Sequence, residues 1–428
     1  MSRAALTCLG LLASALVVAV PAPAYADTEV DCTEVTTQNQ YESPVGTDRP
    51  SLPLQEMAVD RAVAHLAELG KQPGEGVVVA VLDSGVVPST GIPLAGQLKA
   101  GAKSPPEYYH GTAVAGLIAG PPRADGSAVG IAPAAQILDV QVYDDPVNEA
   151  TAESSPITPE NIRNGLDQVI AALGQLNIKV VTIALQLPYD EGIRERVERL
   201  WDLGVVVVAP TGNRPGETDG GPALLDEEYE QHRPGEDVAD LIHPADYEHV
   251  LAVNSTMKGL EGTVEPTDLV LENSQTDLAA PTALAVSYSV QGGTCVLNVP
   301  ATSWAAAEVS GVLALLFSAY DDNPAQAVSR LRYTAAGRPD LPNTLVGAGE
   351  VQAFQALTRP IEMDELGTVT SAGQVLDEPQ VLAVPEEPDD VLASTRENAV
   401  WWGLLGGGAL LLALVLRPVL ARRRRYGG

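Results

Sequence analysis

Five short runs of apolar, largely β-branched residues recur along the chain at intervals that leave room for helices. They cover Val77–Leu82, Ile137–Val142, Ile178–Leu185, Val205–Ala209 and Val250–Val253. Strands that are apolar on both faces are typical of a parallel sheet with helices packed against both sides. Two intervening segments, Pro159–Leu176 and Glu191–Leu203, are predicted helices, and Gly204 takes the C-cap position of the second. We therefore expect an α/β fold of three layers around a mostly parallel central sheet, within residues 55–357.

The first 26 residues have the layout of an export signal. Arg3 precedes an apolar run over residues 4–20, and Ala24-Tyr25-Ala26 offers the small residues that signal peptidase accepts. A short membrane anchor is the alternative, but the run is short for a span. We predict a signal peptide over residues 1–26, followed by a polar N-terminal extension over residues 27–54 that is too short to fold alone.

A second apolar run, Ala399–Leu416, is long enough to cross a bilayer as one helix. Trp401 and Trp402 lie at its front edge, and five arginines occur among residues 417–428. A GPI-type signal is the alternative, but the basic tail argues against it. Because basic residues stay on the cytoplasmic side, we predict a single-pass protein of the cell membrane with an extracytoplasmic domain and a short cytoplasmic tail.

The charge of the chain bears on its partners and its linkers. The formal net charge is −31 and the pI is near 4.3, which excludes nucleic acid as a partner for the body of the protein. Residues 358–398 are rich in proline and acidic residues, so we expect a flexible stalk before the membrane span. The acidic stretch Asp226–Asp237 is expected to be a solvated surface insertion.

Three short segments carry candidate catalytic residues in the order Asp, His, Ser. Asp83 ends the first apolar run, His110 opens a segment of small and apolar residues, and Ser303 lies in the first turn of a predicted long helix. Hydrolysis by serine needs an imidazole to take the hydroxyl proton and a carboxylate to fix the imidazole's tautomer. Taken singly, they have ordinary explanations as a turn former, a core histidine and a helix cap. Their order and context together predict a catalytic triad.

A fourth candidate follows the run Val205–Ala209. The chain continues there into Thr211-Gly212-Asn213, which places an asparagine just beyond a strand and a glycine turn. The side-chain amide of Asn213 is suited to donate a hydrogen bond to a tetrahedral oxyanion. An ordinary turn asparagine is the alternative.

The cysteines allow one disulfide, and no metal or cofactor site is evident. Cys8 leaves with the signal peptide, so the exported chain keeps Cys32 and Cys295, which either pair or remain two free thiols. Pairing would hold the N-terminal extension close to the segment that leads into Ser303. The remaining histidines and the acidic loops lack the spacing of a zinc or calcium site, and we expect these histidines at the surface or in loops. They are His65, His232, His243 and His249.

The catalytic segments resemble the three signatures of the subtilisin-like peptidases. They are Val79-Ala-Val-Leu-Asp-Ser-Gly, His110-Gly-Thr-Ala-Val-Ala-Gly, and Thr302-Ser303 with its alanine-rich helix. The resemblance implies the subtilisin-like fold, a serine endopeptidase acting on protein or peptide substrates, and Asn213 at the oxyanion position. The signal, stalk, span and tail are similar in layout to the mycosins, the membrane-anchored proteases of type VII secretion systems. This second resemblance implies association with a secretion membrane complex, and we expect an enzyme with few substrates.

Several residues depart from the subtilisin-like pattern. Tyr109 and Ala301 stand where glycines are usual, Ala307-Glu308 replaces the usual Ala-Pro or Thr-Pro, and residues 182–187 lack the glycines of the family's substrate-flanking strand. Added side-chain bulk predicts a narrow, selective cleft. Two alternatives remain: a structural subunit that keeps the protease fold to stabilise the secretion complex with weak or no proteolysis, and a general scavenging protease, which permanent anchoring disfavours.

Overall fold

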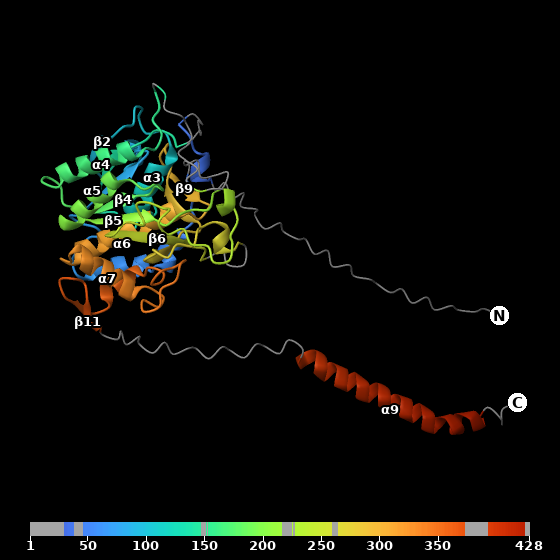
Figure 1. Ribbon diagram of the computed structural model, residues 1–428. Coiled ribbons are helices and arrows are strands. Elements are labelled where there is room, and N and C mark those ends of the chain that lie inside the picture. Colours follow the sequence, from blue (N-terminus) through green and yellow to red (C-terminus); the bar gives the residue numbers. More distant parts are fainter. Residues whose placement is uncertain are drawn as a thin grey trace. The chain divides into compact units, whose positions relative to one another are not determined.

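The structure is a computed structural model (Figure 1). It describes residues 30–37, 46–146, 151, 153–215, 225, 227–258, 264–372 and 393–423. The predicted signal peptide, most of the predicted stalk and the end of the basic tail lie outside these residues. The chain divides into two units, Met1–Gln374 and Val375–Gly428, which are considered separately below.

A seven-stranded sheet forms the centre of the first unit, in the order β2-β3-β1-β4-β5-β6-β7. Its strands are β1 (Val78–Asp83), β2 (Leu94–Lys99), β3 (Gln136–Gln141), β4 (Ile178–Ile183), β5 (Val206–Pro210), β6 (Val250–Thr256) and β7 (Leu278–Pro281). All the pairings between them are parallel, which confirms the predicted sheet. The five apolar runs became the five inner strands. The two edge strands were not predicted, because β2 is half polar and β7 is very short.

Helices cover both faces of this sheet (Figure 1). They are α1 (Leu52–Glu56), α2 (Val59–Glu68), α3 (Tyr109–Ala119), α4 (Pro159–Ala172), α5 (Glu191–Asp202), α6 (Thr302–Ala319), α7 (Pro324–Thr334) and α8 (Ala353–Thr358). Alternate residues of β1 belong to different core clusters. Val79 and Val81 pack with α2, α3 and α6, whereas Ala80 and Leu82 pack with α4 and α5. The three layers follow from this alternation, since successive side chains of a strand point to opposite faces.

The N-terminal extension is packed against the domain near its C-terminal half. Cys32 and Cys295 form a disulfide with their Cα atoms 5.0 Å apart. Cys295 belongs to β9 (Thr294–Leu297), which pairs with β8 (Ala285–Tyr288) in a separate hairpin. The Val296 amide donates to the carbonyl oxygen of Val30 at 3.0 Å. The extension therefore continues a small sheet, and helix α1 already begins at Leu52, before the predicted start of the domain.

The first part of the predicted stalk has a regular structure of its own. Strands β10 (Ile361–Met363) and β11 (Val369–Ala372) form an antiparallel hairpin. The Asp364 side chain accepts hydrogen bonds from the amides of Leu366 and Thr368, which closes the turn. The sequence prediction of a stalk from residue 358 was therefore wrong for this hairpin, because an Asp-capped turn outweighed the acidic, proline-rich composition.

The second unit contains one long helix, α9 (Ala393–Arg423). It includes Trp401–Pro418, an 18-residue window with a mean hydropathy of 1.4 and no buried residues. Among the described residues, one other helix has the length and hydropathy of a membrane span, Thr302–Ala319, but 83% of that window is buried in the first unit as part of its core. Helix α9 therefore contains the candidate span, close to the predicted residues 399–416.

Candidate active site

Asp83 and His110 meet at the carboxyl end of the central sheet. Asp83 is the last residue of β1 and is 1% exposed, while His110 is in the first turn of α3. The imidazole Nδ1 lies 3.0 Å from Asp83 Oδ1 and 2.9 Å from Oδ2. A carboxylate at this nitrogen fixes the ring tautomer and leaves Nε2 as the second ring nitrogen for proton transfer. The pair therefore has the geometry of an oriented general base.

The turn after β1 holds this pair together. Ser84 Oγ donates to the Tyr108 carbonyl at 3.1 Å and accepts from the Gly111 amide at 2.9 Å, which ties the turn to the start of α3. Gly85 has φ +94°, and a Cβ on Gly111 would lie 2.7 Å from the Gly85 carbonyl oxygen. Only glycine at both positions allows the strand end and the helix start to approach this closely.

Two buried groups determine the electrostatics around Asp83. Tyr143 donates its hydroxyl to Asp83 Oδ1 at 3.1 Å, and burial, with the nearby Asp83 charge, raises the Tyr143 pKa well above 10. The phenol therefore remains a donor across the physiological range. Asp139 on β3 accepts from the Val86 amide at 3.1 Å and from Gln97 Nε2 at 2.9 Å. Burial raises the Asp139 pKa to about 6, and the negative charge of Asp83 adds to that effect.

Ser303 lies in the first turn of α6 and is 6% exposed. Its neighbour Trp304 places this turn beside the histidine, because the indole and imidazole centroids are 4.7 Å apart with an interplanar angle of 34°. Trp304 Nε1 donates to the Val299 carbonyl at 3.2 Å, which fixes the indole. The N-terminus of an 18-residue helix supplies positive potential at Ser303, which would stabilise a negative charge formed there.

Asn213 contacts the residue before Ser303. It follows β5, and its Oδ1 accepts from the Thr302 amide at 2.8 Å and from Thr302 Oγ1 at 2.9 Å. Because the amide oxygen is occupied in this way, the Nδ2 group is the end of the side chain that remains to donate. An amide N–H is the kind of donor that an oxyanion hole uses.

The substituted glycine positions fit the backbone without strain. Ala301 has φ −149°, an extended conformation open to any residue, and Tyr109 is the first residue of α3. The Tyr109 ring packs 6.1 Å from His110 and 6.4 Å from Trp304, so the histidine has aromatic side chains beside it. Glu308 lies further along α6 and is buried, and neither of its carboxyl oxygens has a hydrogen-bond partner among the described residues. Burial first, and then the charge of Glu350, raise the Glu308 pKa well above 4.5.

The residues singled out from the sequence fall into contacting groups. Asp83 contacts His110, and Asn213 contacts the start of the helix that carries Ser303. Sequence reasoning missed Tyr143, although its position two residues beyond β3 places it at the same sheet edge as Asp83.

One other expectation needs correction. The acidic stretch 226–237 is not wholly solvated, because Glu236 is buried in an ion pair with Arg214. Contacts from distant segments cover this side chain, which composition alone assigns to the surface. His243 lies in a loop, as expected, but is only 5% exposed there, and burial lowers its pKa.

Comparison with known proteins gives a consistent set of relatives. The model of the subtilase family (Peptidase_S8) matches residues 74–349. Mycosin-1 of Mycobacterium tuberculosis is 29% identical over 312 residues, which cover 67% of this chain and 69% of that protein. Mycosin-3 of the same species is 28% identical over 397 residues, which cover 82% of this chain and 81% of that protein.

Solved structures share the fold. The crystal structure of MycP1 from Mycobacterium smegmatis gives a TM-score of 0.57 at 21% identity, covering 79% of this chain and 92% of that one. A chain from the structure of an intact ESX-5 inner membrane complex gives a TM-score of 0.56 at 20% identity, covering 90% of this chain and 93% of that one. The family match spans more than half of the chain and includes all four candidate site residues. The chain thus belongs to the subtilase family and is a subtilisin-like serine peptidase similar to the mycosins.

Proposed function

We propose that the protein is a membrane-anchored, extracytoplasmic serine endopeptidase in which Asp83, His110 and Ser303 act as the triad. The observation that carries the proposal is the contact of His110 Nδ1 with the buried Asp83 carboxylate, beside the helix start that bears Ser303. Asn213 is proposed as the side-chain donor of the oxyanion hole. The aromatic side chains beside His110 favour a selective enzyme with few substrates.

The proposed reaction uses each group once. His110 Nε2 takes the Ser303 hydroxyl proton as Oγ attacks the peptide carbonyl, and Asp83 stabilises the imidazolium that forms. Asn213 Nδ2 and the N-terminus of α6 stabilise the negative oxygen of the tetrahedral intermediate. His110 then protonates the leaving amine, and water hydrolyses the acyl-enzyme by the same steps in reverse roles.

The proposed location and partner rest on the ends of the chain and on its relatives. Residues 1–26 would direct export. The apolar part of α9 would span the cell membrane, and the arginines that follow it would keep the tail in the cytoplasm. The mycosin relatives and the fold shared with a chain of the ESX-5 inner membrane complex support association with a type VII secretion complex. Co-purification of the full chain with secretion membrane proteins from detergent extracts tests this partnership, and a reproducibly solitary protein would contradict it.

Peptide hydrolysis by the purified full chain tests the proposed activity. Wild-type protein incubated with a peptide library should release new N-termini, and Ser303→Ala should reduce that rate by at least about 1,000-fold. Ser310→Ala is the matched control, because Ser310 is a buried serine of the same helix that bonds to Thr182 and Ala306. If the folded wild-type chain releases new N-termini as slowly as Ser303→Ala does, the protein is instead a structural subunit with a protease fold.

A further inference from the structure

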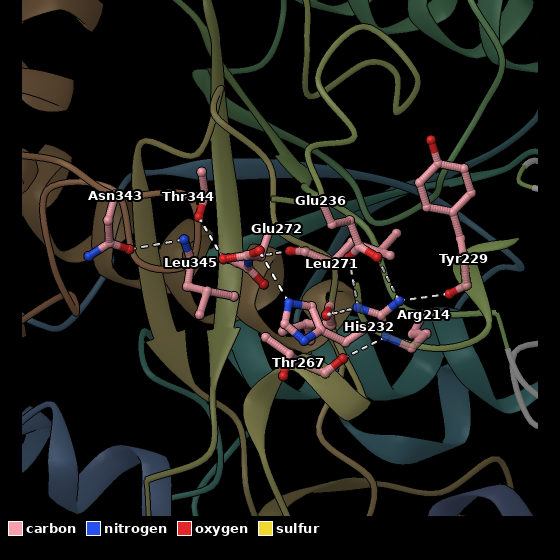
Figure 2. A network of polar contacts seen from close by, with 12 residues as sticks. Arg214, Tyr229, His232, Glu236, Thr267, Leu271, Glu272, Asn343, Thr344 and Leu345 are labelled. Atoms are coloured by element: carbon pink, nitrogen blue, oxygen red, sulfur yellow. Dashed lines mark hydrogen bonds and ion pairs between the residues drawn. The ribbon is translucent and has the colours of Figure 1, made fainter. Parts of the chain in front are cut away.

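Arg214, the residue after the proposed oxyanion asparagine, is buried with all five of its N–H donors engaged. Nε donates to the Thr267 carbonyl at 2.6 Å. Nη1 donates to the Tyr229 carbonyl at 2.8 Å and to Glu236 Oε2 at 3.1 Å. Nη2 donates to Glu236 Oε1 at 2.7 Å and to the Val270 carbonyl at 3.4 Å. A guanidinium offers five donors in a fixed plane, so this site is fully matched to arginine (Figure 2).

The Arg214–Glu236 pair is more buried than any other ion pair among the described residues. Its side chains are 3% and 1% exposed. Removing two charges from water is costly, and a two-pronged pair with additional hydrogen bonds is the arrangement that offsets this cost. Such a pair adds little to the stability of the fold, but it tolerates little displacement of either side chain and so fixes the relative position of the segments that carry them.

The pair joins three segments that are far apart in the sequence. Arg214 follows the turn after β5, Glu236 and Tyr229 belong to the loop over residues 227–237, and Thr267 and Val270 belong to the loop before β7. Figure 2 shows the carbonyls of the last two segments converging on the guanidinium. The next residue of that loop, Leu271, is followed by Glu272, which accepts from Thr344 at 3.0 Å and extends the network.

The same contacts fix Asn213 on both sides. The Arg214 amide donates to the Leu269 carbonyl at 2.9 Å, and the Leu271 amide donates to the Gly212 carbonyl at 3.1 Å. Gly212 has φ +123°, and a Cβ there would lie 3.0 Å from Leu271 Cδ1. Asn213 is thus clamped between two backbone hydrogen bonds, with its side chain bound to Thr302 immediately before Ser303.

We infer that Arg214 and Glu236 are positioning residues for the oxyanion hole. They hold the turn that bears Asn213 against the loop over residues 267–271, and thereby set the direction in which Asn213 Nδ2 points. The inference rests on the proposed role of Asn213. Within the acidic loop over residues 227–237, it assigns this positioning role to the side chain of Glu236.

A paired replacement in the full chain tests this inference. Arg214→Met/Glu236→Leu removes both charges together, which avoids leaving one buried charge without its partner. The probe is an alkyl fluorophosphonate, whose reaction with Ser303 builds charge on an oxygen that occupies the oxyanion hole. We expect the maximal labelling rate to fall about 10- to 100-fold with little change in the probe concentration at half-maximal rate, because a donor displaced by about 1 Å loses most of its effect. Arg214→Lys should give an intermediate rate.

The matched control is Arg233→Met/Glu228→Leu, which removes an exposed ion pair of the same loop, 3.1 Å apart with side chains 51% and 49% exposed. It should label at the wild-type rate. A paired variant of Arg214 and Glu236 that is folded and labels as fast as wild type would overturn the inference.

A second readout does not depend on activity. Hydrogen exchange of the Thr302 amide, which is bound to Asn213 Oδ1, should be faster in the Arg214 and Glu236 variant than in the control. If the wild-type chain does not react with the probe, the proposed function fails. Faster exchange in that case still supports the positioning of Asn213 by the pair, and unchanged exchange overturns it.

Discussion

At the scale of single residues, the Asp83 carboxylate is held by hydrogen bonds from three groups. They are His110 Nδ1, the Ser84 amide at 2.7 Å and the Tyr143 hydroxyl at 3.1 Å. Hydrogen bonds to the ionised form stabilise the negative charge in a buried site. In the proposed mechanism this charge stabilises the His110 cation, so the hydrogen bonds to Asp83 are expected to support the reaction indirectly.

Replacing Tyr143 with phenylalanine tests this contribution. Tyr143→Phe keeps the ring but removes one hydrogen bond to Asp83, so we expect kcat/KM to fall about 3- to 10-fold. The free energy of unfolding should fall by about 1 kcal/mol. Tyr288→Phe is the control, since the Tyr288 hydroxyl donates to the Pro121 carbonyl at 2.9 Å. It should show a similar stability loss with unchanged kcat/KM, and equal effects on kcat/KM in both variants would contradict the role of Tyr143.

Asp139 should make the stability of the wild-type chain depend on pH. Its pKa is about 6 in the folded protein and near 3.8 when unfolded. Between these values the folded state holds the proton and the unfolded state releases it, so stability is lost as pH rises from about 4 to 6. A shift of this size corresponds to about 3 kcal/mol at most. Asp139→Asn keeps an acceptor for Val86 and Gln97 and should remove this loss in denaturation measured at pH 4, 5 and 7. Parallel pH profiles for the two proteins would contradict the assignment.

At the scale of elements, helix α6 has two roles. Its first turn presents Ser303, and its remaining turns form the middle of the core between the sheet and the surrounding helices. Its apolar residues are distributed around the whole circumference, which is typical of a fully buried helix. Glu308 is the charged residue of this helix, and it is buried with no hydrogen-bond partner within the part of the chain that the structure describes.

Replacing Glu308 with an apolar residue of similar length should stabilise the protein. Glu308→Met removes a carboxyl whose pKa is raised well above 4.5 by burial and by Glu350. The folded wild-type chain keeps this proton while the unfolded chain releases it above pH 4.5, so the wild-type chain loses stability as pH rises. We expect the variant to gain about 1–3 kcal/mol at pH 8 and less at pH 5, measured by chemical denaturation. A variant less stable than wild type at pH 8 would show that the carboxylate has a favourable role.

The inner elements were predictable and the peripheral ones were not. Each inner strand is apolar on both faces, so its sequence alone marks it as buried. Edge strand β2 and the hairpin β10–β11 have mixed composition, and they form because neighbouring segments pair with them. The same difference applies to the candidate site. The residues predicted from the sequence, Asp83, His110, Ser303 and Asn213, stand at or just beyond the ends of regular elements. The contact between Arg214 and Glu236 was not predictable, because it depends on the path of an irregular loop.

At the scale of the whole molecule, the chain combines a compact catalytic unit with a separate apolar helix. The first unit, to Gln374, contains the complete sheet, both helical layers and every candidate site residue. Anchoring and catalysis are therefore expected to be separable.

Ending the chain after Gln374 tests that separation. The truncated protein lacks the candidate span, Trp401–Pro418. It should therefore appear in the soluble fraction and no longer in the membrane fraction. It should label with a fluorophosphonate at a rate close to that of the full chain. A truncated protein that stays with the membrane would show that the catalytic unit has a membrane contact of its own. Loss of labelling in a folded truncated protein would show that the site needs the second unit.

The central claim is that Ser303 is a nucleophile activated by His110 and Asp83. It is tested most directly by reacting the full chain with a fluorophosphonate and locating the adduct by peptide mass mapping. We predict one adduct, on Ser303, that is absent in Ser303→Ala and forms at least about 1,000-fold more slowly in His110→Ala. A folded wild-type chain that forms no adduct, or an adduct on another residue that persists in Ser303→Ala, would contradict the account.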